Sequence, residues 1–425
     1  MKHLILLILI AGLAPGLPAQ PGFDAWFEHK TLRLDFVHAG GHAGEELFFD
    51  DLMEEPFWGG STRYLVDTTG YGNYLVHLRD LATGTLIYSR GFCTLFGEWR
   101  GTTEAKQVRR ACTGSVVLPY PKADALVEIL VRETRTGRFE KKFEHPVRVH
   151  DDFIKRERRA TYPTREIQVT GDPARRVDIV LLPDGYTAAE MEKFLDDCRA
   201  FTRGLFSFSP YREHASLFNV RAVMAPSLES GTDNPREHVW KNTLLGASFY
   251  TLDSERYLMT YDHKTLRTLA AHVPYDFIYV IVNTGKYGGG AIYNHYGISV
   301  SGNILAAKVY VHEFGHLFLG LGDEYAEDGA YNDMYPLDVE PWEANLTTLV
   351  RFESKWKDML DAATPVPTPL DPARPDRLGV YEGGGYAFKG VYRPRQDCLM
   401  RTLSGNDFCP VCTRAIVEQV HRYAE

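Results

Sequence analysis

The sequence predicts a multidomain α+β protein in which an N-terminal antiparallel β-sandwich precedes a mixed α/β domain. Residues 21–150 contain short runs of β-branched and aromatic residues bounded by turn signals, a pattern typical of a sandwich. From about residue 173, strand-like runs alternate with helical ones. A charge-dense stretch at residues 150–159 separates the two patterns. We therefore expect a β domain at 21–150, a linker at 151–172 and a second domain at 173–425.

Strand-like composition recurs four times in the first domain, at Tyr64–Val66, Tyr74–Arg79, Leu86–Tyr88 and Leu126–Val131. Asp80–Gly84 and Thr136-Gly137 stand beside such runs and predict hairpin turns. Acids, bases and metal ligands do not gather here in a pattern that indicates chemistry. We expect this domain to have a structural or substrate-docking role.

The second domain is predicted to contain a mixed sheet with helices packed against it. Its strand candidates are Val177–Leu182, Phe218–Met224 and Phe277–Val282. A helix is expected over Ala188–Arg203, ended by Gly204, because apolar residues recur on one of its faces. Those residues are Phe194, Leu195, Cys198 and Phe201, so Cys198 is expected to be a buried thiol.

The stretch His312-Glu-Phe-Gly-His316 is the strongest chemical signal in the sequence. Residues four apart on a helix share a face, so His312 and His316 can bind one ion. Glu313 lies where it can hold and deprotonate a water, the general-base role of the His-Glu-x-x-His motif. The neighbouring residues are apolar, which argues against a surface helix with two stray histidines. We predict one catalytic Zn²⁺ bound by His312 and His316, with Glu313 as the catalytic base.

A catalytic zinc needs a third protein ligand and one open position. We predict Asp323, because it follows the Gly320-Leu-Gly322 turn that ends the helix and can return to the ion. Glu324 is the next residue along the chain. A glutamate on a later helix, Glu340 or Glu343, is a different solution that the sequence leaves open.

A glycine-rich segment, residues 285–293, precedes the metal-binding helix. A phosphate-binding loop would need a lysine after its last glycine and a helix beyond it, and neither is present. We interpret the segment as a turn that feeds a strand over Ala291–Val300. An exposed edge there could pair with an extended peptide by strand addition, and a plain loop is an equal alternative.

Residues 1–20 have the pattern of a secretory signal, with Lys2 before an apolar run from Leu4 to Leu13 and small residues around Ala19. The run is too short for a comfortable membrane span, and no later stretch is long enough. We expect a secreted, periplasmic or cell-surface protein without stable membrane insertion. The net charge of −9 gives no basic footprint, so nucleic acid is not an expected partner. The sequence does not indicate an oligomeric state.

Some of the six cysteines should be bridged in an exported chain. Cys93 and Cys112 share the first domain and are a candidate pair. Cys398 is expected to pair with Cys409 or Cys412, and the sequence does not decide between them. Cys409-Pro-Val-Cys412 also has the spacing of half a metal knuckle or of a redox pair, although no second such pair exists.

Taken together, these motifs resemble the bacterial immunoglobulin-A metallopeptidase family of metzincin-like zinc peptidases. The resemblance covers most of the chain. It rests on His312-Glu-Phe-Gly-His316 with Gly320-Leu-Gly-Asp323-Glu-Tyr325, Tyr381-Glu-Gly-Gly-Gly-Tyr386, Tyr392-Arg-Pro394, Cys398-Leu-Met400-Arg401, Phe408-Cys-Pro-Val-Cys412, and Tyr88-Ser-Arg-Gly-Phe92 with Glu98-Trp99. It implies a metzincin-like zinc metallopeptidase domain at 173–425, with Met400 in a turn beneath the metal. The plain alternative for Met400 is an ordinary core methionine.

The chain departs from the broader metzincin pattern after the second histidine. In that pattern the helix-ending glycine and the third ligand come three and six residues later, positions held here by Leu319 and Gly322. The glycine and the acid come one residue further on, as Gly320 and Asp323. Thr402 stands where some metzincins have a tyrosine, so the residue that stabilises the oxyanion is not identified.

The expected function is hydrolysis of peptide bonds by an exported zinc endopeptidase that binds a peptide or protein substrate in extended form. Neither the cleavage specificity nor cleavage of immunoglobulin A follows from these residues. The alternative is an exported adhesion or glycan-binding protein with a structural zinc, whose fourth position another cysteine or histidine would fill. A zinc hydrolase of non-peptide substrates is a further possibility.

Overall fold

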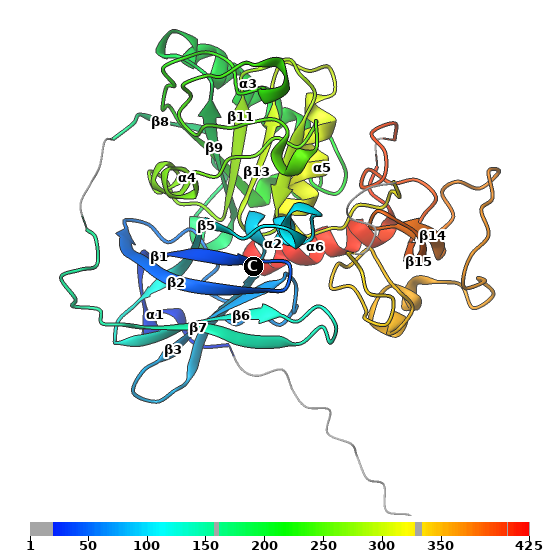
Figure 1. Cartoon of the computed structure of the whole chain (residues 1–425), viewed down its shortest axis with the longest axis horizontal. Coiled ribbons are helices and arrows are strands. Elements are labelled where there is room, and N and C mark those ends of the chain that lie inside the picture. The colour runs from blue at the N-terminus through cyan, green and yellow to red at the C-terminus, as the bar shows by residue number, and fades with distance from the viewer. Residues whose placement is uncertain (1–19, 157–160, 328–333, 406, 425) are drawn as a thin grey trace, which may run out of the picture.

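The computed structural model describes residues 20–156, 161–327, 334–405 and 407–424 (Figure 1). The chain is a mixed α/β protein with an N-terminal β region, which confirms the coarse fold class. The predicted signal peptide at residues 1–20 lies outside the described residues, apart from Gln20. Within the described residues, no helix combines the length and the apolar character that a membrane crossing requires.

The N-terminal region consists of two antiparallel sheets. One sheet has the order β2-β1-β5 and the other β4-β3-β6-β7. The strands are β1 (Phe27–Gly41), β2 (Gly44–Glu55), β3 (Tyr74–Asp80), β4 (Leu86–Phe92), β5 (Arg110–Pro121), β6 (Ala125–Arg132) and β7 (Phe139–Val147), with short helices α1 (Phe23–Trp26) and α2 (Leu95–Trp99). Both predicted hairpin turns are confirmed, and Gly84 and Gly137 provide the positive φ of 72° and 67° that these turns need. Leu34 of β1 and Leu78 of β3 are fully buried in the core that the two sheets share.

A six-stranded sheet with the order β12-β13-β11-β9-β10-β8 forms the centre of the second part of the chain. Its four inner strands are parallel, and the edge strands are antiparallel to their neighbours. The strands are β8 (Thr164–Gln168), β9 (Val177–Asp184), β10 (Phe218–Val223), β11 (Phe277–Val282), β12 (Gly289–Ile292) and β13 (Tyr296–Val300). The three strands predicted from Val177, Phe218 and Phe277 onwards are therefore present.

Three expectations about strands need correction. Tyr64–Val66 is not a strand, because the backbone N–H groups of Leu65 and Val66 donate to the side chain of Gln20 rather than to a neighbouring strand. The predicted linker at residues 151–172 includes β8, which is polar enough in sequence to pass for a connection. The predicted strand over Ala291–Val300 is a hairpin of β12 and β13, because the chain reverses at Asn294, whose φ is 52°. Asparagine tolerates this left-handed conformation better than most residues.

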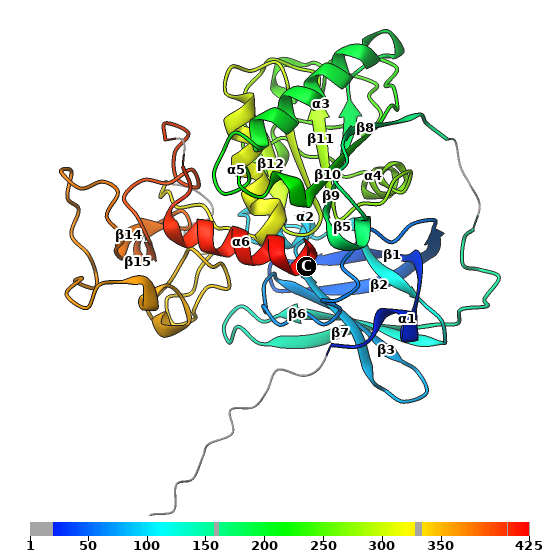
Figure 2. The same ribbon diagram turned by 180° about the vertical axis from the view of Figure 1, so that it is seen from behind.

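Helices cover both faces of this sheet (Figures 1 and 2). They are α3 (Met191–Leu205), α4 (His263–Ala270), α5 (Ala306–Leu319) and α6 (Pro410–Ala424), with a small hairpin of β14 (Tyr381–Gly384) and β15 (Ala387–Arg393). Ile179 and Leu181 of β9 pack in the core formed with α3, α5 and α6. Val180 and Leu182, which point the other way, share a core with α4 and with Leu95 of the N-terminal region. The β region thus docks on the α4 face of the sheet.

All six cysteines are free thiols in the structure, so neither predicted disulfide is present. Cys93 and Cys112 belong to different apolar clusters. The sulfurs of Cys398 and Cys412 are 3.9 Å apart, whereas a disulfide requires about 2.05 Å. Cys198 is a fully buried thiol on α3, as predicted.

Helix α5 ends at Gly320, where the chain turns back sharply. Gly320 has a φ of 65°, and its backbone N–H donates to the carbonyl of His316 at 2.9 Å. A Cβ at this position would lie 2.4 Å from the ring of Trp342. The indole of Trp342 is held in turn by a hydrogen bond to Asn73 of the N-terminal region. Only glycine satisfies both the backbone conformation and the close approach.

Gly320→Ala is predicted to reduce the free energy of unfolding by more than its matched control, Gly246→Ala. Gly246 has a similar φ of 59° but open space around its Cβ position. The control should lose about 1–2 kcal/mol from backbone strain alone. Gly320→Ala should lose about 1–3 kcal/mol more, because the Trp342 ring must move. Equal losses in urea titrations of the two variants would contradict this account of the helix end.

Candidate metal centre and active site

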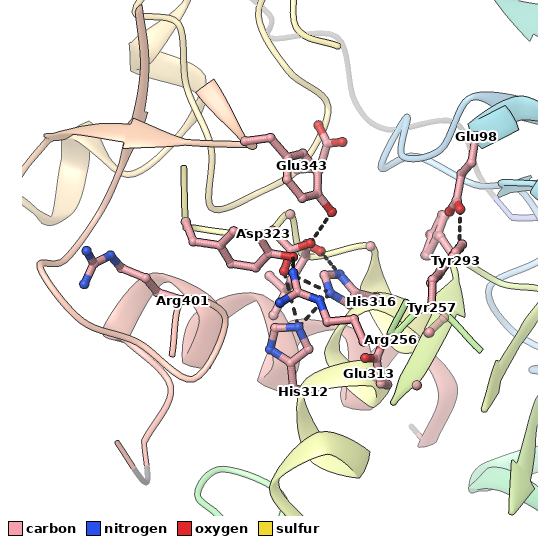
Figure 3. A pocket seen from close by; sticks show the side chains of 18 of the residues that line it. Glu98, Arg256, Tyr257, Tyr293, His312, Glu313, His316, Asp323, Glu343 and Arg401 are labelled. Atoms are coloured by element: carbon pink, nitrogen blue, oxygen red, sulfur yellow. Dashed lines mark hydrogen bonds and ion pairs between the residues drawn. The ribbon is translucent and has the colours of Figure 1, made fainter. Parts of the chain in front are cut away.

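Three side chains converge at the C-terminal half of α5 (Figure 3). His312 Nε2 and His316 Nε2 are 3.1 Å apart. Asp323 Oδ1 lies 3.3 Å from His312 Nε2 and 3.4 Å from His316 Nε2. Asp323 comes from the extended segment after the Gly320 turn, which brings it back to the helix face.

The donor set fits a zinc ion. Zinc ligands at about 2.0–2.1 Å in tetrahedral geometry stand about 3.3–3.4 Å from one another, close to the separations observed here. Asp323 Oδ1 is buried and accepts no hydrogen bond from any described residue, so it has a free lone pair for a cation. Two imidazoles and one carboxylate are the ligand set of an open zinc site. The fourth coordination position would then face the cavity described below.

The three glutamates left open by the sequence lie elsewhere. Glu324 points away from the histidines, and its Oε1 accepts a hydrogen bond from Asn345 at 2.9 Å. Glu340 accepts from the backbone N–H of Arg351 at 2.9 Å. Glu343 accepts from the Tyr335 hydroxyl at 3.0 Å and lines the cavity without joining the ligand group.

Each ligand is oriented by a second contact. His312 Nδ1 lies 2.9 Å from the carbonyl oxygen of Leu399, and His316 Nδ1 lies 2.5 Å from that of Leu321. Donation from Nδ1 to these carbonyls leaves the Nε2 lone pairs directed at the ion position. The hydroxyl of Tyr386 donates to Asp323 Oδ2 and leaves Oδ1 for the ion.

Charge in this group is strongly coupled. Burial would raise the pKa of Asp323, but His316 and His312 hold it well below its usual range. Burial would lower the pKa of His316, but the carboxylate of Asp323 raises it to about 9. A cation that binds here must therefore displace protons from the imidazoles, so its affinity should fall as the pH falls.

Glu313 lines the same cavity as the three ligand candidates. Burial raises the pKa of its carboxyl group, and the neighbouring His312 and His316 offset part of that rise. A carboxylate with a raised pKa accepts a proton more readily, as a general base must.

Met400 is fully buried beneath the ligand helix. A Cβ placed on Gly315 would lie 2.9 Å from the Met400 sulfur, so the thioether packs against the helix between the two histidines in sequence. The backbone carbonyl of Met400 accepts from the N–H of Glu324 at 2.8 Å. The turn that carries Met400 thus contacts both the helix and the segment that returns Asp323.

A cavity of about 550 Å³ opens over the three ligand candidates and Glu313. Its wall also includes Arg256 and Tyr257 from the loop before β12, Tyr287, and Glu98 from the N-terminal region. The sequence analysis names Glu98 only as part of the family resemblance, without a role. Arg256 and Tyr257 precede His312 by more than 50 positions and Glu98 by more than 200, so spacing alone could not group them with the motif.

Glu98 connects the two parts of the chain at this cavity. It lies on α2, and its carboxyl accepts a hydrogen bond from the Tyr257 hydroxyl. Burial raises its pKa to about 7, and the negative charges of Glu313 and Asp323 act in the same direction. Glu98 therefore titrates near neutral pH, within the electrostatic reach of the candidate catalytic groups.

Comparison with family models agrees with this arrangement. The model described as IgA Peptidase M64 matches residues 165–376 and 370–420. The model described as Peptidase M64 N-terminus matches residues 22–144. The chain belongs to the IgA peptidase M64 family. No curated protein matches the chain.

Membership in M64 identifies the chain as a metallopeptidase, so a metal cofactor and a peptide or protein substrate follow from it. The first M64 match includes the histidine motif and Asp323, and the second includes Met400. The N-terminal match includes Glu98, so the family models span every part of the chain that contributes to the cavity.

Asp323→Ala is predicted to weaken zinc binding more than any substitution outside the three ligands. Tyr386→Phe, which removes the hydrogen bond to Asp323, should cost about 10–100-fold in affinity, as the loss of outer contacts to metal ligands usually does. The measurement is zinc affinity by competition with a chelator of known strength.

Glu343→Gln is the control for this comparison, since it changes an acid in the same cavity that does not approach the histidines. Its zinc affinity should stay near that of the unmodified protein. An Asp323→Ala protein that binds zinc as tightly as Glu343→Gln would refute Asp323 as a ligand.

Proposed function

We propose that this M64 protein is an exported, zinc-dependent endopeptidase in which His312, His316 and Asp323 bind the ion and Glu313 is the general base. The observation that carries the proposal is the convergence of three ligand atoms within 3.1–3.4 Å of one another, beside a carboxylate and an open cavity. A purely structural zinc would be enclosed by a fourth protein ligand. Among the described residues, only these three form the group at this position.

The chemistry follows from where each side chain lies. A bound zinc ion would polarise the scissile carbonyl and lower the pKa of a water molecule at the open position. Glu313 would accept a proton from the water molecule that attacks the carbonyl carbon. Glu313 then donates the proton to the departing amine, so one carboxyl group serves first as base and then as acid.

The substrate is proposed to lie along β12 in extended form. Gly289, Gly290 and Ala291 of this edge strand line the cavity beside α5. The outer side of Gly289 is already hydrogen-bonded to the backbone of Arg256 and Leu258. Ala291, two residues on, faces the same outer side and can pair with a peptide by strand addition. A strand added to an edge continues in both directions, which suits cleavage within a chain.

Arg256 is the proposed oxyanion-stabilising residue. Some metzincins have a tyrosine for this role, at the position held here by Thr402. The guanidinium of Arg256 packs over the ring of Tyr325 and lies 3.2 Å from the Tyr325 hydroxyl. Arg256 lines the same cavity as Glu313 and Asp323, and its guanidinium also forms an ion pair with Glu327 at 3.5 Å. A fixed cation near the carbonyl oxygen stabilises the charge that develops during attack.

Export is proposed from residues 1–20, whose charged start and short apolar run have the pattern of a cleaved signal. The metzincin-like classification is also part of the proposal. It is supported by a parallel sheet with an antiparallel edge strand beside the metal helix, and by Met400 packed under that helix.

Glu313→Gln should retain zinc and lose activity on an unstructured protein such as casein by about 10²–10⁴-fold, because the base is removed while the ligands stay. Metal content and turnover are measured on the same preparation. Glu343→Gln, which changes an acid of the same cavity that does not belong to the ligand group, is the control and should remain active. Near-normal turnover by zinc-loaded Glu313→Gln would disprove the mechanism.

Arg256→Gln should lower kcat by about 10²–10³-fold, the usual cost of losing one oxyanion donor, with little change in zinc content. Arg256→Lys should recover part of the rate, since it restores the charge without the planar donor pair. Arg401→Gln tests the specificity of the effect, because Arg401 also lines the cavity but extends away from the ligands (Figure 3). Equal losses in the Arg256 and Arg401 variants would exclude a special role for Arg256.

A further inference from the structure

A second group of ligand-type side chains lies on the opposite side of the segment that carries Asp323. Cys398, Cys409, Cys412 and Glu324 place one sulfur or oxygen atom each within 4.8 Å of the others. All four residues are buried, and none is more than 3% exposed. They come from three separate parts of the chain: the extended segment after Gly320, the Met400 turn and the start of α6.

The distances in this group suit a tetrahedral metal rather than a disulfide. Thiolates at about 2.3 Å from zinc stand about 3.8 Å apart, and a thiolate and a carboxylate oxygen stand about 3.5 Å apart. Cys398 Sγ and Cys412 Sγ are 3.9 Å apart, and Cys412 Sγ is 3.4 Å from Glu324 Oε1.

Backbone geometry around the cysteines favours thiolates. The N–H of Cys409 donates to Cys398 Sγ at 3.3 Å, and the N–H of Cys412 donates to Cys409 Sγ at 3.4 Å. Cys409-Pro-Val-Cys412 stands at the N-terminus of the 15-residue helix α6, whose dipole stabilises negative charge. Pro410 fits the first helical position because it has no N–H to leave unpaired.

Glu324 provides an independent indication of a cation. Its side chain is fully buried, and Oε1 accepts from Asn345, while Oε2 has no hydrogen-bond partner among the described residues. Arg393, the nearby cation that acts on it electrostatically, donates instead to the carbonyls of Glu382 and Gly383. A buried carboxylate without a direct ion pair is costly, and a metal ion beside it removes that cost.

We propose that Cys398, Cys409, Cys412 and Glu324 bind a second Zn²⁺ in a closed, structural site. Three cysteine sulfurs and one carboxylate oxygen fill all four tetrahedral positions, and no position is left for water or substrate. Binding replaces the thiol protons with the metal and releases them to solvent, without any change of oxidation state.

The second site supports the first through single backbone contacts. The carbonyl of Leu399, next to Cys398, orients His312 through Nδ1 at 2.9 Å. The carbonyl of Met400 accepts from the N–H of Glu324 at 2.8 Å, and Glu324 follows directly on Asp323. An ion that fixes Cys398 and Glu324 therefore fixes both the support of His312 and the position of Asp323.

The test is the metal content of the full chain, purified without reducing agent or chelator and measured by mass spectrometry. The unmodified protein should contain two zinc ions per chain, and Cys412→Ser should contain one. Cys198→Ala, which removes an isolated buried thiol on α3, should keep two. His316→Ala should also fall to one by losing the other ion, which separates this proposal from the proposed catalytic site.

Cobalt substitution identifies which site is filled. Thiolate-to-cobalt charge-transfer absorption should persist in His316→Ala, because the histidine and aspartate ligands of the first site contribute none. It should be absent from Cys412→Ser. The spectrum of the unmodified protein decides the question even if the cysteine variant fails to fold.

One zinc ion per chain together with no thiolate absorption would overturn the proposal. A thiol titration of the unfolded, metal-free and unreduced protein is a second test, which distinguishes metal-binding thiols from a disulfide. The proposal requires all six thiols to react. Four reactive thiols in the unmodified protein, rising to five in Cys398→Ser, would show a disulfide at Cys398 and refute the metal site.

Discussion

Asp323 has to return to the face of α5 that carries His312 and His316, and most of the architecture around the cavity serves that return. The turn depends on Gly320, which alone accepts both a left-handed φ and the Trp342 ring above it. Tyr386 then holds one oxygen of Asp323, and the backbone of Gly385 donates to the Asp323 carbonyl at 2.7 Å. The turn of the β14–β15 hairpin therefore holds one carboxylate against two imidazoles.

The N-terminal β region is tied to the same elements. Arg90 donates to the Asn294 side chain at 3.0 Å, and Asn294 donates back to the carbonyl of Gly91 at 2.7 Å. The N–H of Cys93 donates to the carbonyl of Tyr293 at 2.9 Å. These contacts join β4 to the turn between β12 and β13, the edge hairpin beside α5. The same attachment brings α2 and its Glu98 into the cavity wall.

The sequence was sufficient for features that depend on local pattern. His312, Glu313 and His316 follow from helical spacing, and β9, β10 and β11 follow from runs rich in β-branched and aromatic residues. The sequence prediction missed β1, although Leu32, Leu34 and Phe36 alternate there with Arg33 and Asp35 in the period of a strand. The two charged residues are buried and pair with each other at 2.9 Å. The sequence could not identify Arg256 or place Glu98 in the cavity, because contacts between distant segments leave no trace in residue spacing.

The disulfide expectation failed for a related reason. An even number of cysteines favours disulfides in an exported chain. The count does not indicate that the segment after Gly320 places Glu324 next to three of the cysteines. Asp323 and Glu324 are neighbours on an extended segment, so their side chains point to opposite sides of it. Asp323, the predicted zinc ligand, thus belongs to the histidine group, and Glu324, the rejected alternative, belongs to the cysteine group.

The contribution of Glu98 has a practical consequence for how the protein is divided. A shorter protein that begins after the predicted linker would contain the histidine motif, Asp323 and Met400, and would look complete by inspection of its motifs. It would nevertheless lack one wall of the cavity, the partner of Tyr257, and the Asn73 contact that fixes Trp342 over the helix end. The wall of the cavity is therefore built jointly by both halves of the chain, and exchanging N-terminal regions between relatives is a route to altering its shape.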